Sequence, residues 1–181
     1  MVYIILGKGC EPMEAVAPCD ILRRGGVEVR FAGIGGRDIT GGNGITVRAD
    51  CTVEEMDLEN LELIMLPGGM GGVRSILGSE TALNAVRRAW KDGKFVTAIC
   101  AAPTILANLG MLDRRNAVCY PGMEDLMGSA VVQKGSSVVV DGHIVTGEAA
   151  GSAFAFGLKL VEILKGTTVA AQVKESVHYH G

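Results

Sequence analysis

The sequence has no spacing of cysteine or histidine that would mark a zinc site or a disulfide framework. Its five cysteines are an odd number without a Cys-x-x-Cys pair, and its three histidines form no His-x-x-x-His arrangement. Zinc-binding and disulfide-stapled domains depend on such patterns. We therefore expect no bound metal and predict that the thiols are reduced.

Long apolar runs and clusters of positive charge are also missing. No segment is long and apolar enough to span a membrane, and Met1–Gly7 lacks the basic start and the apolar length of a secretory signal. Lysine and arginine gather in nothing larger than a pair, and the net charge is −3. Nucleic-acid-binding surfaces concentrate positive charge. We expect a cytoplasmic protein without a nucleic-acid or membrane partner.

The glycine-rich segments do not match a dinucleotide-binding loop. Gly33–Asp38 follows a β-type segment, but the residues after it, Thr40–Gly44, are rich in glycine and do not open an apolar helix. The pyrophosphate of a dinucleotide needs the N-terminus of such a helix. Gly68–Gly72 contains no Gly-x-Gly-x-x-Gly motif either. We expect no cofactor.

The patterns that are present favour a single α/β domain over residues 1–181. The chain is 48% hydrophobic, enough to bury a sizeable core, and it shows no linker, repeat or low-complexity tract. Short, uniformly apolar segments alternate with helical patterns at Pro12–Arg24 and Glu80–Lys91. This order predicts a mostly parallel sheet covered by helices on both faces. The candidate strands are Val2–Leu6, Glu28–Ala32, Thr46–Arg48, Leu63–Leu66, Phe95–Ile99 and Ala117–Cys119.

A late antiparallel hairpin is expected beside this sheet. The dipeptide Asp141-Gly142 tolerates the positive φ of a tight turn, and it lies between the β-type segments Ser137–Val140 and His143–Thr146. Helices are predicted after it at Gly151–Leu164 and Thr168–Val173.

The segment Phe95–Thr104 places one cysteine between a predicted strand and a predicted helix that Pro103 opens. The sharp turn would hold the Cys100 sulfur near the positive end of that helix. Cys100 is therefore a candidate nucleophile, and we expect its thiol to ionise more easily than an ordinary thiol.

Two other strand ends meet the same edge of the predicted sheet, where ligands of doubly wound folds collect. The loop Leu66–Gly72 brings glycine amides close to a ligand, so the N–H groups of Gly69 and Ala101 are candidates for an oxyanion hole. Glu14 follows the first strand, in the first turn of a helix, within reach of Cys100. An ionised Glu14 would raise the pKa of the thiol, whereas a protonated one would donate a hydrogen bond and lower it. We therefore predict a neutral Glu14 with a raised pKa.

Four segments together resemble the DJ-one (ThiJ/PfpI) superfamily. Each motif is weak alone, but their order and spacing are specific, and the resemblance runs from Val2 to about Lys174. It implies a flavodoxin-like three-layer sandwich with a nucleophile elbow, and usually a homodimer. The segments are Glu11-Pro12-Met13-Glu14, Leu66-Pro67-Gly68-Gly69, Ala98 to Thr104, and Val169-Ala170-Ala171-Gln172-Val173.

The resemblance also implies roles for particular residues. Cys100 would be a reactive, easily oxidised thiol with a protonated Glu14 as its partner, and Gly69 and Ala101 would be backbone donors. The protease-like branch resembles Cys-His-Gly at the elbow, whereas alanines follow Cys100 here, so peptidase activity is not expected.

The histidine that many close relatives hold beside the cysteine is replaced in this sequence. The segment resembling Thr-His-Pro reads Cys119-Tyr120-Pro121. Tyr120 can hydrogen-bond a substrate oxygen, but a phenol with an ordinary pKa of about 10 is a poor base at neutral pH. Proton transfer would then fall to Glu14 or to Cys100 itself.

Two kinds of function follow from the resemblance and stay open at this point. One is an enzyme acting on a small reactive carbonyl compound, either a glutathione-independent glyoxalase that converts methylglyoxal to lactate or a protein deglycase-like enzyme. The other is a non-catalytic redox sensor or redox-regulated chaperone of the oxidative-stress response, whose partner is an oxidant. Cys10 and Cys119 lie at predicted strand ends near the same edge and are candidates to trap Cys100 as a disulfide.

Overall fold

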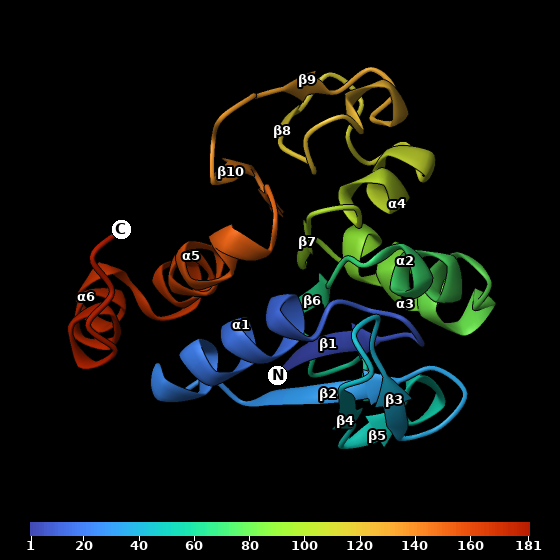
Figure 1. Ribbon diagram of the computed structural model, residues 1–181, viewed down its shortest axis with the longest axis horizontal. Coiled ribbons are helices and arrows are strands. Elements are labelled where there is room, and N and C mark those ends of the chain that lie inside the picture. Colours follow the sequence, from blue (N-terminus) through green and yellow to red (C-terminus); the bar gives the residue numbers. More distant parts are fainter.

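The computed structural model describes residues 1–181, which form a seven-stranded sheet with helices on both faces (Figure 1). The order of the strands is β10-β11-β7-β6-β1-β2-β5. The strands are β1 Val2–Leu6, β2 Val29–Gly33, β3 Asp38–Thr40, β4 Thr46–Arg48, β5 Cys51–Thr52, β6 Leu63–Leu66, β7 Phe95–Ile99, β8 Asn116–Ala117, β9 Val131–Val132, β10 Val138–Asp141 and β11 Ile144–Gly147. The helices are α1 Pro12–Arg24, α2 Met70–Leu77, α3 Glu80–Lys91, α4 Pro103–Asn108, α5 Ala153–Lys165 and α6 Thr167–Ser176.

The sheet is parallel except at one edge. β1, β6 and β7 are neighbours and run parallel, and their apolar side chains are almost entirely buried because both faces of the sheet are covered. β10 pairs antiparallel with β11 around Gly142, whose φ is +60°, which confirms the predicted hairpin. The predicted α/β sandwich with a mostly parallel sheet is therefore the observed fold.

Two helical layers enclose two buried clusters of side chains. α1, α5 and α6 cover one face of the sheet, and α2, α3 and α4 cover the other (Figure 1). α3 begins after Ser79 because the Ser79 hydroxyl accepts a hydrogen bond from the Ala82 amide at 3.2 Å, as its N-cap. No helix is long and apolar enough to cross a lipid bilayer.

The chain changes direction across the sheet between β1 and β6. β2 lies on one side of β1, whereas β6 lies on the other. The connection after β1 leads into α1 on one face, and the connection after β6 leads into α2 on the opposite face. Such a switch point leaves a crevice at the carboxyl ends of the strands. The ends of β1, β6 and β7 therefore meet at one place.

Two predicted strands lie outside the main sheet. β4 pairs only with β3, antiparallel, and its exposed ends show that this ribbon lies on the surface; the edge of the main sheet is formed by β5. The segment predicted at Ala117–Cys119 forms only β8, which pairs with β9 in a second small sheet. Both segments have β-type side chains, but local composition does not choose their partners.

One predicted loop is partly helical. Met70–Gly72, expected as part of a glycine-rich loop, is the first turn of α2. The glycines of this segment favour a loop in the sequence because the propensity of glycine for a helix interior is low. Val73 and Ile76 are buried against the sheet, and this packing overrides the local preference.

Candidate functional site

Cys100 occupies a strained turn directly after β7. Its φ is +66°, a left-handed conformation that non-glycine residues rarely adopt. The Cys100 amide donates to the Gly147 carbonyl at 2.9 Å, and the Cys100 carbonyl accepts from the Tyr120 amide at 2.8 Å. These two bonds hold the backbone in the turn, and α4 begins three residues later at Pro103. The structure therefore has the sharp strand-to-helix elbow that the sequence predicts.

Glu14 reaches this elbow from the first turn of α1. Its side chain is only 1% exposed, and its Oε2 accepts a hydrogen bond from the Gly68 amide at 2.8 Å. The carboxyl group is also a hydrogen-bond partner of the Cys100 thiol. The structure thus brings together Glu14 and Cys100, which are far apart in the sequence.

Gly68 lies against both side chains and leaves room for them to meet. A Cβ atom at this position would stand 2.7 Å from Glu14 Oε2 and 2.9 Å from Cys100 Cβ. Both distances are shorter than van der Waals contact. A residue with a side chain at position 68 would therefore push the carboxyl and the thiol apart.

We expect Gly68→Ala to lower the stability of the protein by about 1–3 kcal/mol, the usual cost of overpacking. It should also lower the pKa of the Cys100 thiol, because moving the carboxylate away removes charge repulsion. Urea unfolding and the pH dependence of thiol alkylation measure the two effects. Gly151→Ala is the control, since a Cβ there meets no atom within 4 Å and its φ is not positive. Equal stability of the two variants would contradict the steric argument.

The pKa of Glu14 is raised to about 7, chiefly because burial disfavours the charged carboxylate. Hydrogen bonds from Cys100 and from the Gly68 amide oppose this rise, and the negative charge of Glu11 adds to it. Glu14 can therefore both accept and release a proton near neutral pH. The predicted rise in the pKa of Glu14 is confirmed.

The pKa of the Cys100 thiol is raised to about 12, so the expectation of an easily ionised thiol is wrong while Glu14 is charged. Burial is the largest cause, followed by the charge of Glu14, and the amides of Ala101 and Gly69 lower the pKa by less. α4 has only six residues, too short to offset the burial. Protonating Glu14 removes its charge and turns it into a hydrogen-bond donor to the sulfur. A protonated Glu14 therefore lowers the pKa of the Cys100 thiol, whereas an ionised Glu14 raises it. The pair thus holds at most one negative charge near neutral pH.

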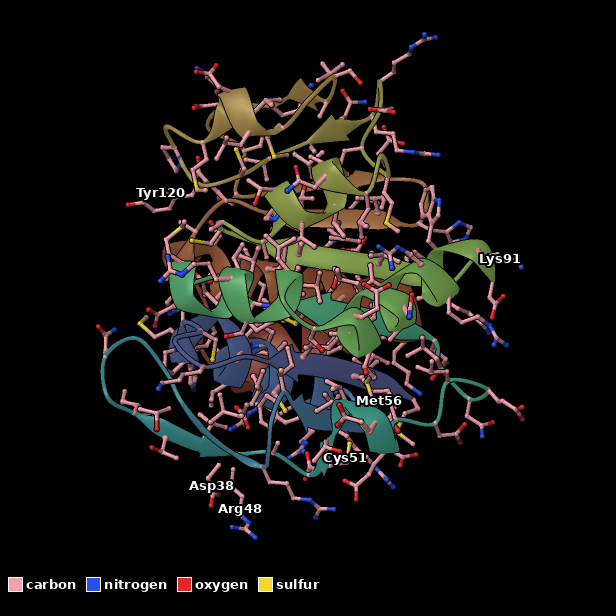
Figure 2. The ribbon with its side chains drawn as sticks, turned by 90° about the vertical axis from the view of Figure 1, so that its right-hand side faces the viewer. Asp38, Arg48, Cys51, Met56, Lys91 and Tyr120 are labelled. Carbon is pink, nitrogen blue, oxygen red and sulfur yellow. The ribbon has the colours of Figure 1, made fainter.

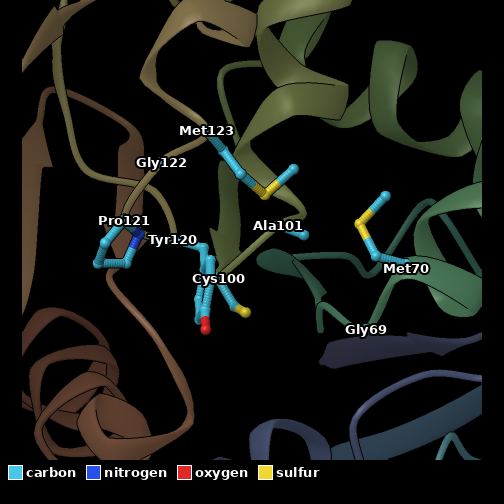
Figure 3. A pocket seen from close by; sticks show the side chains of 8 residues that line it. All are labelled: Gly69, Met70, Cys100, Ala101, Tyr120, Pro121, Gly122 and Met123. Atoms are coloured by element: carbon cyan, nitrogen blue, oxygen red, sulfur yellow. The ribbon is translucent and has the colours of Figure 1, made fainter.

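The thiol of Cys100 opens into a cavity of about 520 Å³ (Figure 3). Of the predicted site residues, Cys100, Gly69, Ala101 and Tyr120 line this cavity, and Glu14 does not. Glu14 instead meets the sulfur from the protein interior. The remaining lining residues are Met70, Pro121, Gly122 and Met123.

Gly69 lines the cavity directly before the start of α2. Its φ is +78°, and a Cβ there would lie 2.7 Å from the Glu11 amide nitrogen and the Gly9 carbonyl oxygen. The close approach of these backbone segments therefore requires glycine. Hydrogen bonding from the amides of Gly69 and Ala101 lowers the pKa of the Cys100 thiol, so both amides lie beside the sulfur. Their role as an oxyanion hole stays a prediction.

Tyr120 stands at the rim of the cavity. Its side chain is 48% exposed, its hydroxyl has no hydrogen-bond partner, and Figure 2 shows it projecting from the edge of the molecule. The Tyr120 backbone, in contrast, is tied to the Cys100 carbonyl. No histidine lines the cavity.

Sequence reasoning missed Met70 and Met123. In the sequence, Met70 is only a member of a glycine-rich loop, and Met123 lies in a turn without a recognisable motif. Their position next to segments that end at the sheet edge was the only available signal. The figure shows them entering the cavity from different elements, α2 and the loop after β8 (Figure 3).

The other cysteines are buried and carry free thiols. Burial raises the pKa values of Cys10 and Cys119 to about 11, and neither residue lines the cavity. Their role in trapping Cys100 stays a prediction. No group of three or more histidine, cysteine, aspartate or glutamate residues is arranged to hold a metal ion.

A cysteine in a strained turn at the switch point of a parallel sheet, with a buried carboxyl against its sulfur, defines an α/β protein with a cysteine nucleophile elbow. The chain belongs to the DJ-1/PfpI family, whose model matches residues 1–163. Within the family it lies on the DJ-1-like side, as its relatives show.

Comparison with known proteins gives the same result. The chain is 31% identical to protein dj-1beta of Drosophila melanogaster over 176 residues, covering 96% of this chain and 94% of that protein. It is 33% identical over 165 residues to a protein of Pyrococcus abyssi named a deglycase, covering 91% and 99%. The solved structure of oxidized DJ-1 from Toxoplasma gondii superposes with a TM-score of 0.94 at 30% identity, covering 99% and 98%.

Proposed function

We propose that the protein is a cysteine enzyme that acts on small reactive carbonyl compounds, as a glutathione-independent glyoxalase or a deglycase-like enzyme. The observation that carries this proposal is the Cys100 thiol, which faces a cavity while Glu14 contacts it from behind. A thiol attacks an aldehyde readily, and a carboxyl with a pKa of about 7 can both accept and donate a proton at neutral pH. Relatives named deglycases support the same class of chemistry.

In the first step the Cys100 sulfur attacks the aldehyde carbon of a 2-oxoaldehyde. The thiol proton passes to an ionised Glu14, the S–C bond forms, and the carbonyl π electrons move to oxygen. The amides of Gly69 and Ala101 hold the resulting oxyanion. This proton transfer makes the thiolate easier to form despite the high pKa of the thiol, because protonating Glu14 removes the charge that repels the developing thiolate.

The protonated Glu14 first returns its proton to the oxyanion, which gives a hemithioacetal and restores the carboxylate. In the second step this carboxylate takes the proton from the former aldehyde carbon and delivers it to the neighbouring ketone carbon, while the hydroxyl proton of the hemithioacetal moves to the former ketone oxygen. The first carbon is thereby oxidised to a thioester and the second is reduced to an alcohol, so no external oxidant or reductant is needed. Water then cleaves the thioester, releasing a 2-hydroxy acid and the free thiol. For methylglyoxal the sum is one water added and one lactate formed.

The test is the formation of lactate from methylglyoxal by the purified protein without glutathione. We expect turnover that follows the protein concentration. Absence of lactate while mass spectrometry shows an intact Cys100 thiol would reject the glyoxalase proposal.

A redox role is the second candidate, and the donors around the sulfur favour it. The Gly69 and Ala101 amides and a protonated Glu14 would also hydrogen-bond the oxygens of a sulfinate. As a sensor or a redox-regulated chaperone in oxidative stress, the protein would report oxidation of Cys100.

We expect mild peroxide to add oxygen to Cys100 before Cys51. Cys100 is half-buried and opens into a cavity, whereas Cys51 is buried on the edge strand β5, beside β2, and donates to the Phe31 carbonyl at 3.7 Å. Peptide mass spectrometry after stepwise addition of peroxide measures the order. Equal oxidation of the two residues would count against the redox role.

The family resemblance further implies a homodimer, and an exposed apolar surface on α1 supports it. Met13, Val16, Ile45 and Phe154 expose large apolar side chains around one groove, which a second copy would cover. We also infer one domain over residues 1–181 and a cytoplasmic location.

Val16→Glu should convert a dimer into monomers, because it places a charge in an apolar contact. Light scattering after size exclusion measures the mass. Leu126→Glu, at an exposed apolar residue outside the groove, is the control and should leave the mass unchanged. A wild-type protein that is monomeric at all concentrations would refute the dimer.

A further inference from the structure

The cavity in front of Cys100 is bordered by two methionines that no catalytic step uses. Met70 is the first residue of α2, and its side chain is 52% exposed, although Val73 and Ile76 on the same helix are buried. Met123 is held in place by its amide, which donates to the Tyr120 carbonyl at 3.0 Å. An exposed large apolar side chain at the mouth of a cavity is informative because the core does not require it.

The same cavity has no positively charged group. Its eight lining residues include no lysine, arginine or histidine. The nearest charged neighbour in the sequence, Glu124, is negative and pairs with Lys134 at 3.3 Å. Behind the sulfur, Glu14 adds negative charge whenever it ionises. A carboxylate substituent that entered would therefore lose water without gaining a cation to pair with, since the Gly69 and Ala101 amides bind the reacting oxygen.

We propose that Met70 and Met123 form an apolar rim that selects uncharged carbonyl compounds with a hydrocarbon substituent and rejects carboxylates. The inference rests on the proposed function, because it takes Cys100 as the attacking group. The reacting carbonyl lies at the sulfur and the Gly69 and Ala101 amides, and the substituent lies against the two thioether side chains. These flexible, polarizable chains adapt to aliphatic and aromatic groups.

The first experiment compares three 2-oxoaldehydes, phenylglyoxal, methylglyoxal and the anion 4-carboxyphenylglyoxal, all of which can undergo the proposed proton shift. We expect kcat/KM for phenylglyoxal to exceed that for 4-carboxyphenylglyoxal by at least about 100-fold. Met70→Ala and Met123→Ala should each lower kcat/KM for phenylglyoxal by about tenfold, mainly through KM, since the contact is with the substituent. The value for methylglyoxal should fall much less. Met→Leu at either position should restore most of the loss, because leucine keeps the apolar volume.

The controls are exposed leucines that neighbour the rim without lining the cavity. Leu77→Ala lies on α2 with Met70, and Leu126→Ala lies a few residues after Met123. Both should leave the ratio of phenylglyoxal to methylglyoxal within about twofold of wild type. 4-Carboxyphenylglyoxal turned over as well as phenylglyoxal, or a ratio that the methionine variants do not change, would overturn the inference and leave the proposed function standing.

A second experiment measures how the rim discriminates against negative charge, and it needs no turnover. Iodoacetamide is neutral and iodoacetate is anionic, and both alkylate the same thiolate, so the ratio of their rates at Cys100 cancels the thiol pKa. We expect the ratio of the iodoacetamide rate to the iodoacetate rate at Cys100 to exceed that of free glutathione by about tenfold. Met123→Lys should reduce this ratio at least fivefold. Leu126→Lys, the control, should change it less than twofold. A ratio equal to that of glutathione would overturn the inference. If no 2-oxoaldehyde is converted but the ratio behaves as expected, the glyoxalase proposal fails while the selectivity of the rim is upheld.

Discussion

Cys100→Ser should abolish the formation of lactate from methylglyoxal, with a loss of at least about 10³-fold in kcat. The serine hydroxyl occupies nearly the same place, but its pKa is far above that of a thiol, so a carboxylate such as Glu14 cannot deprotonate it effectively. The fold should tolerate the change because the strained backbone at this residue is held by main-chain bonds to Gly147 and Tyr120. The measurement is lactate release at saturating methylglyoxal.

The control for this loss is Cys51→Ser, which replaces a buried cysteine on β5 outside the cavity. It should retain the turnover of wild type, provided that thermal unfolding shows both variants folded. Substantial lactate from Cys100→Ser would show that Cys100 is not the nucleophile, whatever the state of the other thiols.

Glu14→Gln should separate the ionisation of the thiol from the proton transfer that turnover needs. Removing the carboxylate removes charge repulsion, so the pKa of Cys100 should fall from about 12, and alkylation should begin at lower pH. Turnover should nevertheless fall by about 10²–10⁴-fold, because glutamine can neither accept nor deliver the proton. A variant with an unchanged thiol pKa and full turnover would contradict the assigned partnership.

The same variant should change how stability depends on pH. In the folded protein the pKa of Glu14 is about 7, against an ordinary value of 4.5, so the folded state binds its proton more tightly than the unfolded state. The stabilisation from this group is complete below pH 4.5 and is lost as the pH rises through 7. The difference corresponds to about 3 kcal/mol.

Urea unfolding of wild type and Glu14→Gln between pH 4.5 and pH 8 measures this contribution. The free energy of unfolding of wild type should fall relative to the variant as the pH rises, since glutamine does not titrate. Glu175→Gln removes an exposed carboxyl on α6, away from Glu14, and it should keep the wild-type dependence. Parallel curves for wild type and Glu14→Gln would show that Glu14 does not carry a raised pKa.

Much of the fold could be predicted because its central elements have unambiguous patterns. β1, β6 and β7 are continuous apolar segments, and α1 and α3 have clear starts at Pro12 and after Ser79. The small strands β4 and β8 were recognised as extended, but their pairing was not. Pairing depends on contacts between residues distant in the sequence, and two or three residues carry too little pattern to specify a partner.

The features of the site also fall into those that the sequence predicts and those that depend on the tertiary structure. The sequence by itself determined the elbow at Cys100, the glycines that let backbone segments approach, and Glu14 at the start of a helix, because each is a local pattern of residue types. Only the tertiary structure decided the charge on the pair and the character of the cavity. Burial by distant segments raises the pKa values of Glu14 and Cys100, and Met70 and Met123 line the same cavity as the thiol only because their elements pack together. The exclusion of water from the Glu14–Cys100 pair and the approach of the cavity-lining residues depend on the whole fold. No local segment of the sequence therefore predicts them.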